Sequence, residues 1–422
     1  MDGDGDGRVL DERASYGELL RVREYRALLT ADALSLVGDQ LTRVAVAALV
    51  LARTDSALLT LATFAVGMLP GLVGGPVLAT LADRVPRRGL MVACDLARAL
   101  LVACLLLPGL PLPALLGLLF GASLLTAPFE AARAATVPDV LPDRLYPAGM
   151  ALSNLLVEVG QVVGLLLAGA AVALLSPGTA IGLDVLTFLA SAALVRARLA
   201  DRPVPPREDG PAPGVLADTV AGLRLVAGDP LLRGLLLLAW AGAAVVGVPE
   251  GLALVEATRA GTGPVTTALL LAAVPAGAAV GSLLYARLLT PRRQQALMLP
   301  VCALGALPLL ASPLSPAAGA TALLWFLAGT ASCFQLAANA AFVRAVPDHS
   351  RGRAFGVAQA GLLASQGLAL LVAGALADLV APRVVVAAAG VLGLLAVAAI
   401  ARSWPRADRT DRTVAVPAPV PA

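Results

Sequence analysis

Charged side chains inside long apolar segments are the residues of this sequence best placed to do chemistry. The segment at 26–52 carries Asp32, Asp39 and Arg43, and spacings of seven and four residues place them on one face of a helix. A charge at the centre of a membrane helix costs about 2.5–3.5 kcal/mol, so each needs a partner, a cavity or a function. Asp39 and Arg43 can pair along the helix, and this pair can serve either ion coupling or structure alone.

Glu158 stands apart because no basic residue lies within a turn of it on its own segment, 147–175. It is therefore either paired across helices, with Arg43 as one candidate, or protonated and able to titrate. A functional role is the favoured interpretation. Asp39 and Glu158 are the candidates for proton exchange.

Two further acid–base pairs lie near segment ends. Asp95 with Arg98, and Glu130 with Arg133, are each three residues apart and so share a helix face. Both pairs lie close to the inner ends of their segments, so bracing of the inner loops is the favoured interpretation for both.

The second half of the chain carries fewer charges. Glu250 follows Pro249, which we expect to interrupt its helix, and a broken helix can line a cavity. Amides are more frequent here than acids. Gln335 and Asn339 join Arg43 and Glu250 as the residues predicted to line a substrate cavity.

The elements that must position these residues are membrane helices. Apolar residues make up 59% of the chain and charged ones 14%, against about 45–50% and 25% in soluble domains. The apolar blocks lack strand-like alternation and are near the length of about 20 residues that spans a bilayer. We expect 12 helices, at 26–52, 57–81, 89–107, 112–136, 147–175, 179–199, 231–255, 265–288, 294–312, 317–343, 353–380 and 383–402.

The two halves of the sequence repeat one another. A gapless shift of 205 positions aligns six pairs of prolines, which are 70/275, 86/291, 108/313, 111/316, 142/347 and 177/382. In an apolar chain, two parallel halves of six helices indicate a transporter whose repeats are related by an axis along the membrane normal.

Arginine distribution predicts the orientation. The chain has no lysine, and an N-terminus inside places 26 of its 31 arginines in cytoplasmic segments or at cytoplasmic helix ends. The predicted organisation is a cytoplasmic segment at 1–24, a six-helix bundle at 25–200, a cytoplasmic linker with an amphipathic surface helix at 201–230, a second bundle at 231–403 and a disordered cytoplasmic tail at 404–422.

The loop after the second segment resembles the loop motif of the major facilitator superfamily. It contains Asp83-Arg84 and, two residues later, Arg87-Arg88, with Ala79 and Pro86 where that family usually has glycine. The resemblance implies an all-α, two-bundle fold with both termini cytoplasmic. It also implies a cytoplasmic latch that favours the outward-facing state, comprising Asp83, Arg84, Arg87, Arg88, Asp95, Arg98, Glu130 and Arg133.

Other stretches are similar to one branch of that family, the enterobactin-type siderophore exporters and macrolide efflux pumps. They include 38–45, 94–100 and 229–233. Helix five departs from the antiporter motif, because Leu165 stands where that motif has proline. The resemblance implies export of a small, fairly apolar molecule in exchange for protons.

Several classes of function are disfavoured or left as alternatives. Without lysine there is no phosphate-binding loop for ATP, and the four cysteines lack metal-ligand spacing, so we expect no cofactor and no metal. We expect a monomeric protein of a bacterial plasma membrane that binds its substrate, protons and lipid but no nucleic acid. An importer, a uniporter or a lipid flippase on the same fold are the alternatives. A membrane-embedded transferase is disfavoured because no acid-rich metal pair is present.

Overall fold

The computed structural model describes residues 16–73, 84–202, 215–347 and 350–404, and these residues form helices and short connections without a strand. Ten helical spans within them are long and apolar enough to cross a membrane. The other two predicted segments correspond to α3, which is described only to Val73, and to α5, which carries four charged residues. The fold is all-α, as predicted.

The first half runs from α1 to α9. Its helices are α1 (Tyr16–Arg21), α2 (Arg23–Thr54), α3 (Ala57–Val73), α5 (Arg87–Cys104), α6 (Leu112–Leu124), α7 (Thr126–Val140), α8 (Tyr146–Leu174) and α9 (Pro177–Arg198). Helices α6 and α7 follow one another as a single apolar span, 112–140.

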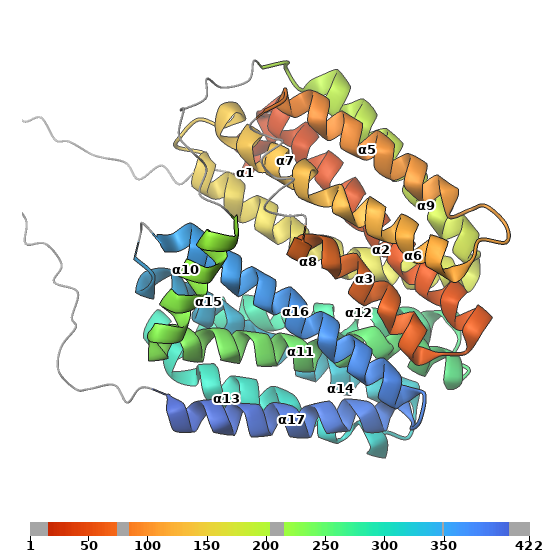
Figure 1. Ribbon diagram of the computed structural model, residues 1–422, viewed down its shortest axis with the longest axis vertical. Helices are drawn as coiled ribbons and strands as arrows, with labels where there is room; N and C mark the ends of the chain where they lie inside the picture. Colours follow the sequence, from red (N-terminus) through yellow and green to blue (C-terminus); the bar gives the residue numbers. More distant parts are fainter. Residues whose placement is uncertain (1–15, 74–83, 203–214, 348–349, 405–422) are drawn as a thin grey trace, which may run out of the picture.

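The second half runs from α10 to α17. Its helices are α10 (Val215–Gly228), α11 (Pro230–Arg259), α12 (Pro264–Leu288), α13 (Pro291–Leu310), α14 (Ala318–Thr330), α15 (Phe334–Ala345), α16 (Arg351–Ala377) and α17 (Pro382–Ser403), with short 3₁₀ turns at Ser312–Leu314 and Ala331–Cys333. In Figure 1 the first half lies above the second, and the two bundles meet where α3 lies beside α16.

The repeated prolines occupy equivalent places in the two halves. Pro177 and Pro382 open α9 and α17, where a missing N–H costs nothing because the first helical amides are unpaired anyway. Pro70 and Pro275 both lie inside their helices, α3 and α12. The spacing found in the sequence therefore corresponds to matching helix positions.

The hydrophobic cores show how the halves meet. One cluster includes buried residues of both halves, among them Val50, Leu61, Leu252 and Leu370. Two other clusters each belong to one half, and both lie at the end where α5, α13 and α16 begin with or near arginines. We call this the arginine-rich end. Within the described residues, the halves thus share a core toward the opposite end and have separate cores at the arginine-rich end.

The most extensive crossings between the halves are α3 with α16 and α8 with α12, and α11 also contacts α2 and α3. Both crossings depend on glycine. A Cβ on Gly374 would lie 2.8 Å from Leu58 Cα, and one on Gly169 would lie 2.7 Å from Ala268 Cα. Small residues allow such close approach of helices inside a membrane.

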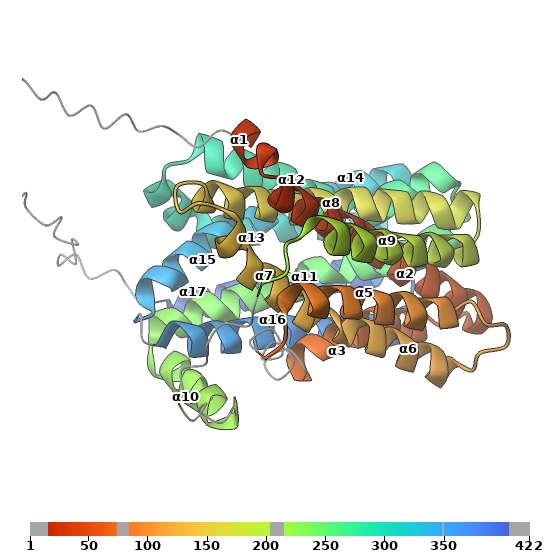
Figure 2. The same cartoon turned by 90° about the horizontal axis from the view of Figure 1, so that it is seen from above.

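The linker helix α10 packs against the arginine-rich end of α16, where a Cβ on Gly222 would lie 2.6 Å from the carbonyl oxygen of Arg353. Figure 2 shows α10 at the edge of the molecule, away from the first half. Its predicted contact with the membrane surface stays a prediction.

Candidate functional site

A cavity of about 430 Å³ lies between the two halves. Residues of α2, α3, α6, α7 and α8 line it from the first half, and residues of α11, α12 and α16 from the second. Its polar lining is Gln40, Arg43, Ser123, Thr126, Gln161, Glu250 and Gln366, and its larger apolar residues are Phe64, Met68, Leu165, Leu271, Leu363 and Leu370. Among the described residues, the cavity therefore offers a wall of mixed polar and apolar side chains with one cation and one acid.

Glu250 faces this cavity from α11 and is held from the other half. The Nε2 atom of Gln161 donates a hydrogen bond of 3.4 Å to Glu250 Oε1. The expected break at Pro249 was wrong, because α11 runs without interruption from Pro230 to Arg259. A proline removes one backbone hydrogen bond, and the preceding and following turns keep this helix continuous.

The other predicted cavity residues lie elsewhere. Gln335 is half-buried and Asn339 exposed, both on α15, and neither lines the cavity. Glu158 lies within α8, and its side chain falls outside the described residues.

Asp39 lies next to the cavity residue Gln40 but points into the first half. Its two carboxylate oxygens accept hydrogen bonds of 2.6 and 2.7 Å from Nη2 of Arg98. The pair along α2 between Asp39 and Arg43 is thus replaced by a pair between helices. Arg43 is left to line the cavity.

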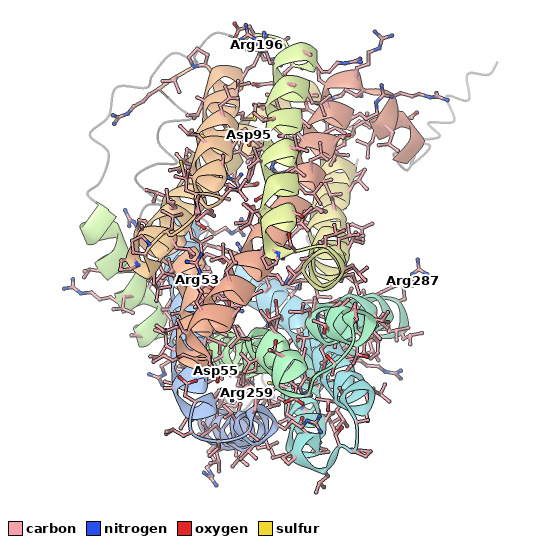
Figure 3. The ribbon with its side chains drawn as sticks, turned by 90° about the vertical axis from the view of Figure 1, so that its right-hand side faces the viewer. Arg53, Asp55, Asp95, Arg196, Arg259 and Arg287 are labelled. Atoms are coloured by element: carbon pink, nitrogen blue, oxygen red, sulfur yellow. The ribbon has the colours of Figure 1, made fainter. Side chains whose placement is uncertain are left out.

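Arg98 is the centre of a buried polar cluster. Its side chain is 2% exposed, its Nη1 donates to Ser35 Oγ at 3.0 Å, and its guanidinium lies 4.2 Å above the ring of Phe188. Asp95 Oδ1 is 4.0 Å from Nη1. The expected bracing of inner loops by Asp95 and Arg98 was wrong, because the interior of the bundle supplies their partners. Figure 3 shows Asp95 within the first half, between the levels of Arg196 and Arg53.

A second cluster lies one to two turns nearer the arginine-rich end. Arg133 pairs with Glu130 at 2.5 Å, as predicted, and also with the buried Asp32 at 3.1 Å. Two acids thus share one guanidinium, and α2 and α7 are tied together there.

The loop motif lies at the arginine-rich end. Arg87 donates to Asp139 Oδ2 at 2.6 Å, and Arg88 donates to the carbonyl oxygen of Arg196 at 2.7 Å. Arg84 is exposed, and Asp83 lies outside the described residues, so a bond from Asp83 stays a prediction. These contacts are within the first half, where they fix α5 against α7 and α9.

The model of the Major Facilitator Superfamily matches residues 28–331 and 261–420 of this sequence. The chain belongs to the major facilitator superfamily. A search of curated proteins finds no match.

Solved structures with a similar fold are membrane transporters. The POT family transporter PepTSo has a TM-score of 0.70 and 11% identity, over 90% of this chain and 97% of that one. A mutant of the nucleoside transporter NupG has a TM-score of 0.71 and 11% sequence identity, and the match covers 91% of this chain and 100% of that one. A third structure is a bacterial homolog of the human lysosomal transporter Spinster in an inward-facing, unoccupied conformation. It has a TM-score of 0.69 and 16% sequence identity, and the match covers 92% of this chain and 98% of that one. At these identities the likeness shows the fold alone.

Sequence reasoning did not select several residues of the site. Gln40 lies three residues before Arg43, so the cavity face of the helix was readable from that spacing. Thr42 and Ser35 are hydroxyl residues whose burial depends on α5 and α9 packing against α2. No local signal in the sequence reveals that packing.

Proposed function

We propose that this superfamily member is a secondary transporter that exports a small, fairly apolar molecule by proton antiport across a bacterial plasma membrane. The observation that carries the proposal is the cavity between the halves, with Arg43 on one wall and Glu250 on the other. A substrate bound there touches both halves, so its binding can bias their relative position.

The packing of the halves supports alternating access. One shared core joins them at one end, while separate cores lie at the arginine-rich end. If that end is cytoplasmic, as the arginines indicate, this is an inward-facing state. Rocking the halves about the cavity would expose it to the other side.

The lining supports the proposed substrate class. Phenylalanine, methionine and leucine side chains provide apolar surface, and amides, hydroxyl groups and Arg43 provide polar contacts. This mixture suits a molecule the size of a macrolide or siderophore fragment with an anionic or hydrogen-bonding group. The transporters with similar folds are named for peptides and nucleosides, so the fold does not choose among substrates.

The acids of the first half support proton coupling. Asp39 is the only acid of the Arg98 cluster with appreciable exposure, at 27% of its side chain, and Glu158 lies on α8, a helix that lines the cavity. We propose both as coupling residues. Arginine does not deprotonate in proteins, so the acids must supply the exchangeable protons.

Transport in proteoliposomes tests this function. Vesicles loaded with erythromycin or enterobactin and a pH indicator should show proton movement opposite to substrate movement. Asp39→Asn and Glu158→Gln should reduce the coupled flux at least tenfold, and the exposed Asp143→Asn should not. Substrate movement with no proton movement would refute antiport and favour a uniporter or flippase.

Glu250→Gln tests the cavity separately. The amide keeps the shape and one acceptor oxygen, so the variant should fold and insert like the parent. We expect at least a tenfold loss of substrate transport, because the acid on the wall of the second half is gone. Unchanged transport of every tested substrate would show that the cavity is not the binding site.

A further inference from the structure

Asp184 is a buried acid that the proposed function has not used. It lies on α9 at its contact with α2 and has no exposed surface. The α2 residue opposite is Gly38, where a Cβ would lie 2.1 Å from Asp184 Oδ1. Only glycine leaves room for this carboxyl, so the two helices form a fitted pocket for it.

The described partners of Asp184 are hydroxyl groups. Thr42 Oγ1 lies 2.5 Å from Oδ2, and Thr187 Oγ1 lies 3.0 Å from Oδ1. Thr187 Oγ1 also lies 2.8 Å from the backbone carbonyl oxygen of Asp184. A hydroxyl has one hydrogen, so it can make a full, linear hydrogen bond to only one of these two oxygens. Both contacts are satisfied together if the side-chain carboxyl of Asp184 is protonated and donates to Thr187 Oγ1. The Thr187 hydroxyl then donates its own hydrogen to the backbone carbonyl oxygen of Asp184.

The charges around Asp184 lead to the same result. Arg98 on α5 and Asp39 on α2 lie near enough to act on the charge of Asp184, and Asp95 shares Arg98 with it; the one acid of α8 is Glu158, whose side chain is not described. Arg98 is already bound by both oxygens of Asp39. One guanidinium thus lies among three carboxyls and directly binds only Asp39.

Asp95 shows that the cluster has too few donors. Its side chain has no exposed surface; Oδ2 accepts a 2.6 Å hydrogen bond from Ser191, but Oδ1 has no hydrogen-bond partner among the described residues. Three carboxylates around one guanidinium leave an excess of negative charge in a mostly buried site, which is costly unless a proton neutralises part of it. At least one acid of this cluster must therefore hold a proton.

We propose that Asp184, within the cluster of Asp39, Asp95 and Arg98, is a proton-binding site, and that it holds the proton in this state. The proposal rests on the proposed antiport for its role in transport. The partly exposed Asp39 gives the buried cluster its contact with water. The proton leaves Asp184 through Asp39, and the carboxylate that remains competes with Asp39 for Arg98.

The position of Asp184 links the proton to the substrate. On α2, Asp39 and Thr42 face the cluster, while the adjacent Gln40 and Arg43 line the cavity. A change of partners at Arg98 or Thr42 therefore moves or turns the same helix segment that contacts the substrate. No chain of distant residues is needed for coupling.

Infrared difference spectroscopy of the purified transporter, stepped from about pH 5 to about pH 9, tests the site without any substrate. The C=O stretch of a protonated carboxyl should disappear as the pH rises. Asp184→Asn should abolish this band, Asp95→Asn and Asp143→Asn should retain it, and Thr42→Val should move the pH at which it disappears. Loss of the band in Asp95→Asn with retention in Asp184→Asn would overturn the assignment.

Transport separates this proposal from the proposed function. If the parent couples erythromycin or enterobactin movement to protons, Asp184→Asn should lose that coupling at least tenfold while still exchanging substrate without a pH gradient. Retained coupling in Asp184→Asn would overturn the inference and leave the antiport intact. A parent that shows the titrating band but no coupled flux would refute the antiport and leave the proton site in place.

Discussion

Asp378 ties the two halves together at the end opposite the arginine-rich one. It follows α16, and its carboxylate accepts hydrogen bonds from Ser56 Oγ at 2.8 Å and from the amides of Ala57 and Leu58 at 2.5 and 3.3 Å. These groups form the N-terminus of α3, where unpaired amides and the helix dipole attract an anion. Asp378→Asn should therefore favour separation of the halves at this end.

The size of the effect follows from these contacts. Hydrogen bonds to a charged group contribute about 1.5–3 kcal/mol, but this carboxylate is 30% exposed and asparagine keeps one acceptor oxygen. We expect a net loss of about 1–2 kcal/mol, which lowers the ratio of joined to separated molecules about 5- to 30-fold. Arg259→Gln removes the exposed ion pair between Arg259 and Asp378, whose charged atoms are 3.7 Å apart. It should lower the ratio of joined to separated molecules less than about fivefold. Figure 3 labels Arg259 of this pair.

The pH dependence is part of the same prediction. Burial raises the pKa of Asp378, but the hydrogen bonds from Ser56, Ala57 and Leu58 and the nearby Arg259 outweigh it, so the pKa lies below its ordinary value of 3.8. A lowered pKa means that the stabilisation is fully present above the ordinary value and is lost as the pH falls through the lowered one. This contact should stay intact across the physiological range.

Distances between spin labels can measure the separation. Leu106 in the first half and Val265 in the second are exposed at this end, and labelled cysteines can replace them after the four native cysteines are changed to alanine. The long-distance population should grow in Asp378→Asn at neutral pH. The reasoning would be refuted by an unchanged distribution, or by opening of the parent between about pH 5 and 8 that Asp378→Asn abolishes.

Two further variants test the first half. Arg98→Gln leaves Asp39 and the buried Asp95 without their cation and should destabilise the protein by about 3–5 kcal/mol. The loss should appear as a large fall in melting temperature in detergent. An unchanged melting temperature would contradict the central role of Arg98. Gly38→Ala forces a Cβ into the Asp184 carboxyl and should cost about 1–3 kcal/mol, whereas Gly182→Ala, on a helix position with nothing within 4 Å, should be neutral or stabilising. Equal melting temperatures for the two alanine variants would show that the Asp184 pocket is not tightly packed.

Local pattern was enough to predict most of the fold. Apolar length placed the helices within a few residues, as for the block 179–199 against α9, Pro177–Arg198. The proline repeat found the relation between the halves because its prolines keep matching places in both, at helix starts for Pro177 and Pro382 and inside helices for Pro70 and Pro275. The helix break predicted at Pro249 was wrong, because a proline inside a long membrane helix need not break that helix when the surrounding turns are kept.

The site was only partly predictable. Arg43 and Glu250 were found because any charge within an apolar block is conspicuous, and Glu130 with Arg133 because their spacing is local. The partner of Asp39 was missed because Arg98 comes from another helix, 59 positions away. Pairing between helices depends on which faces pack together, and neither spacing nor composition encodes that choice.

Because the glycine crossing at Gly374 lies apart from the cavity, evolution can change how fast the halves move and which substrate they bind independently. Gly374 and Gly169 lie where helices of opposite halves touch, and neither lines the cavity. Substitution at either position would alter how readily the halves close, and so the resting orientation and the turnover. At Gly374 a new Cβ would meet Leu58 and Ala57, which do not line the cavity, so the groups that contact the cargo would be left as they are; at Gly169 it would also lie 3.0 Å from Cδ1 of the cavity residue Leu271. Related transporters can therefore diverge in speed at the Gly374 crossing while keeping their substrate, or diverge in substrate at the cavity while keeping their speed.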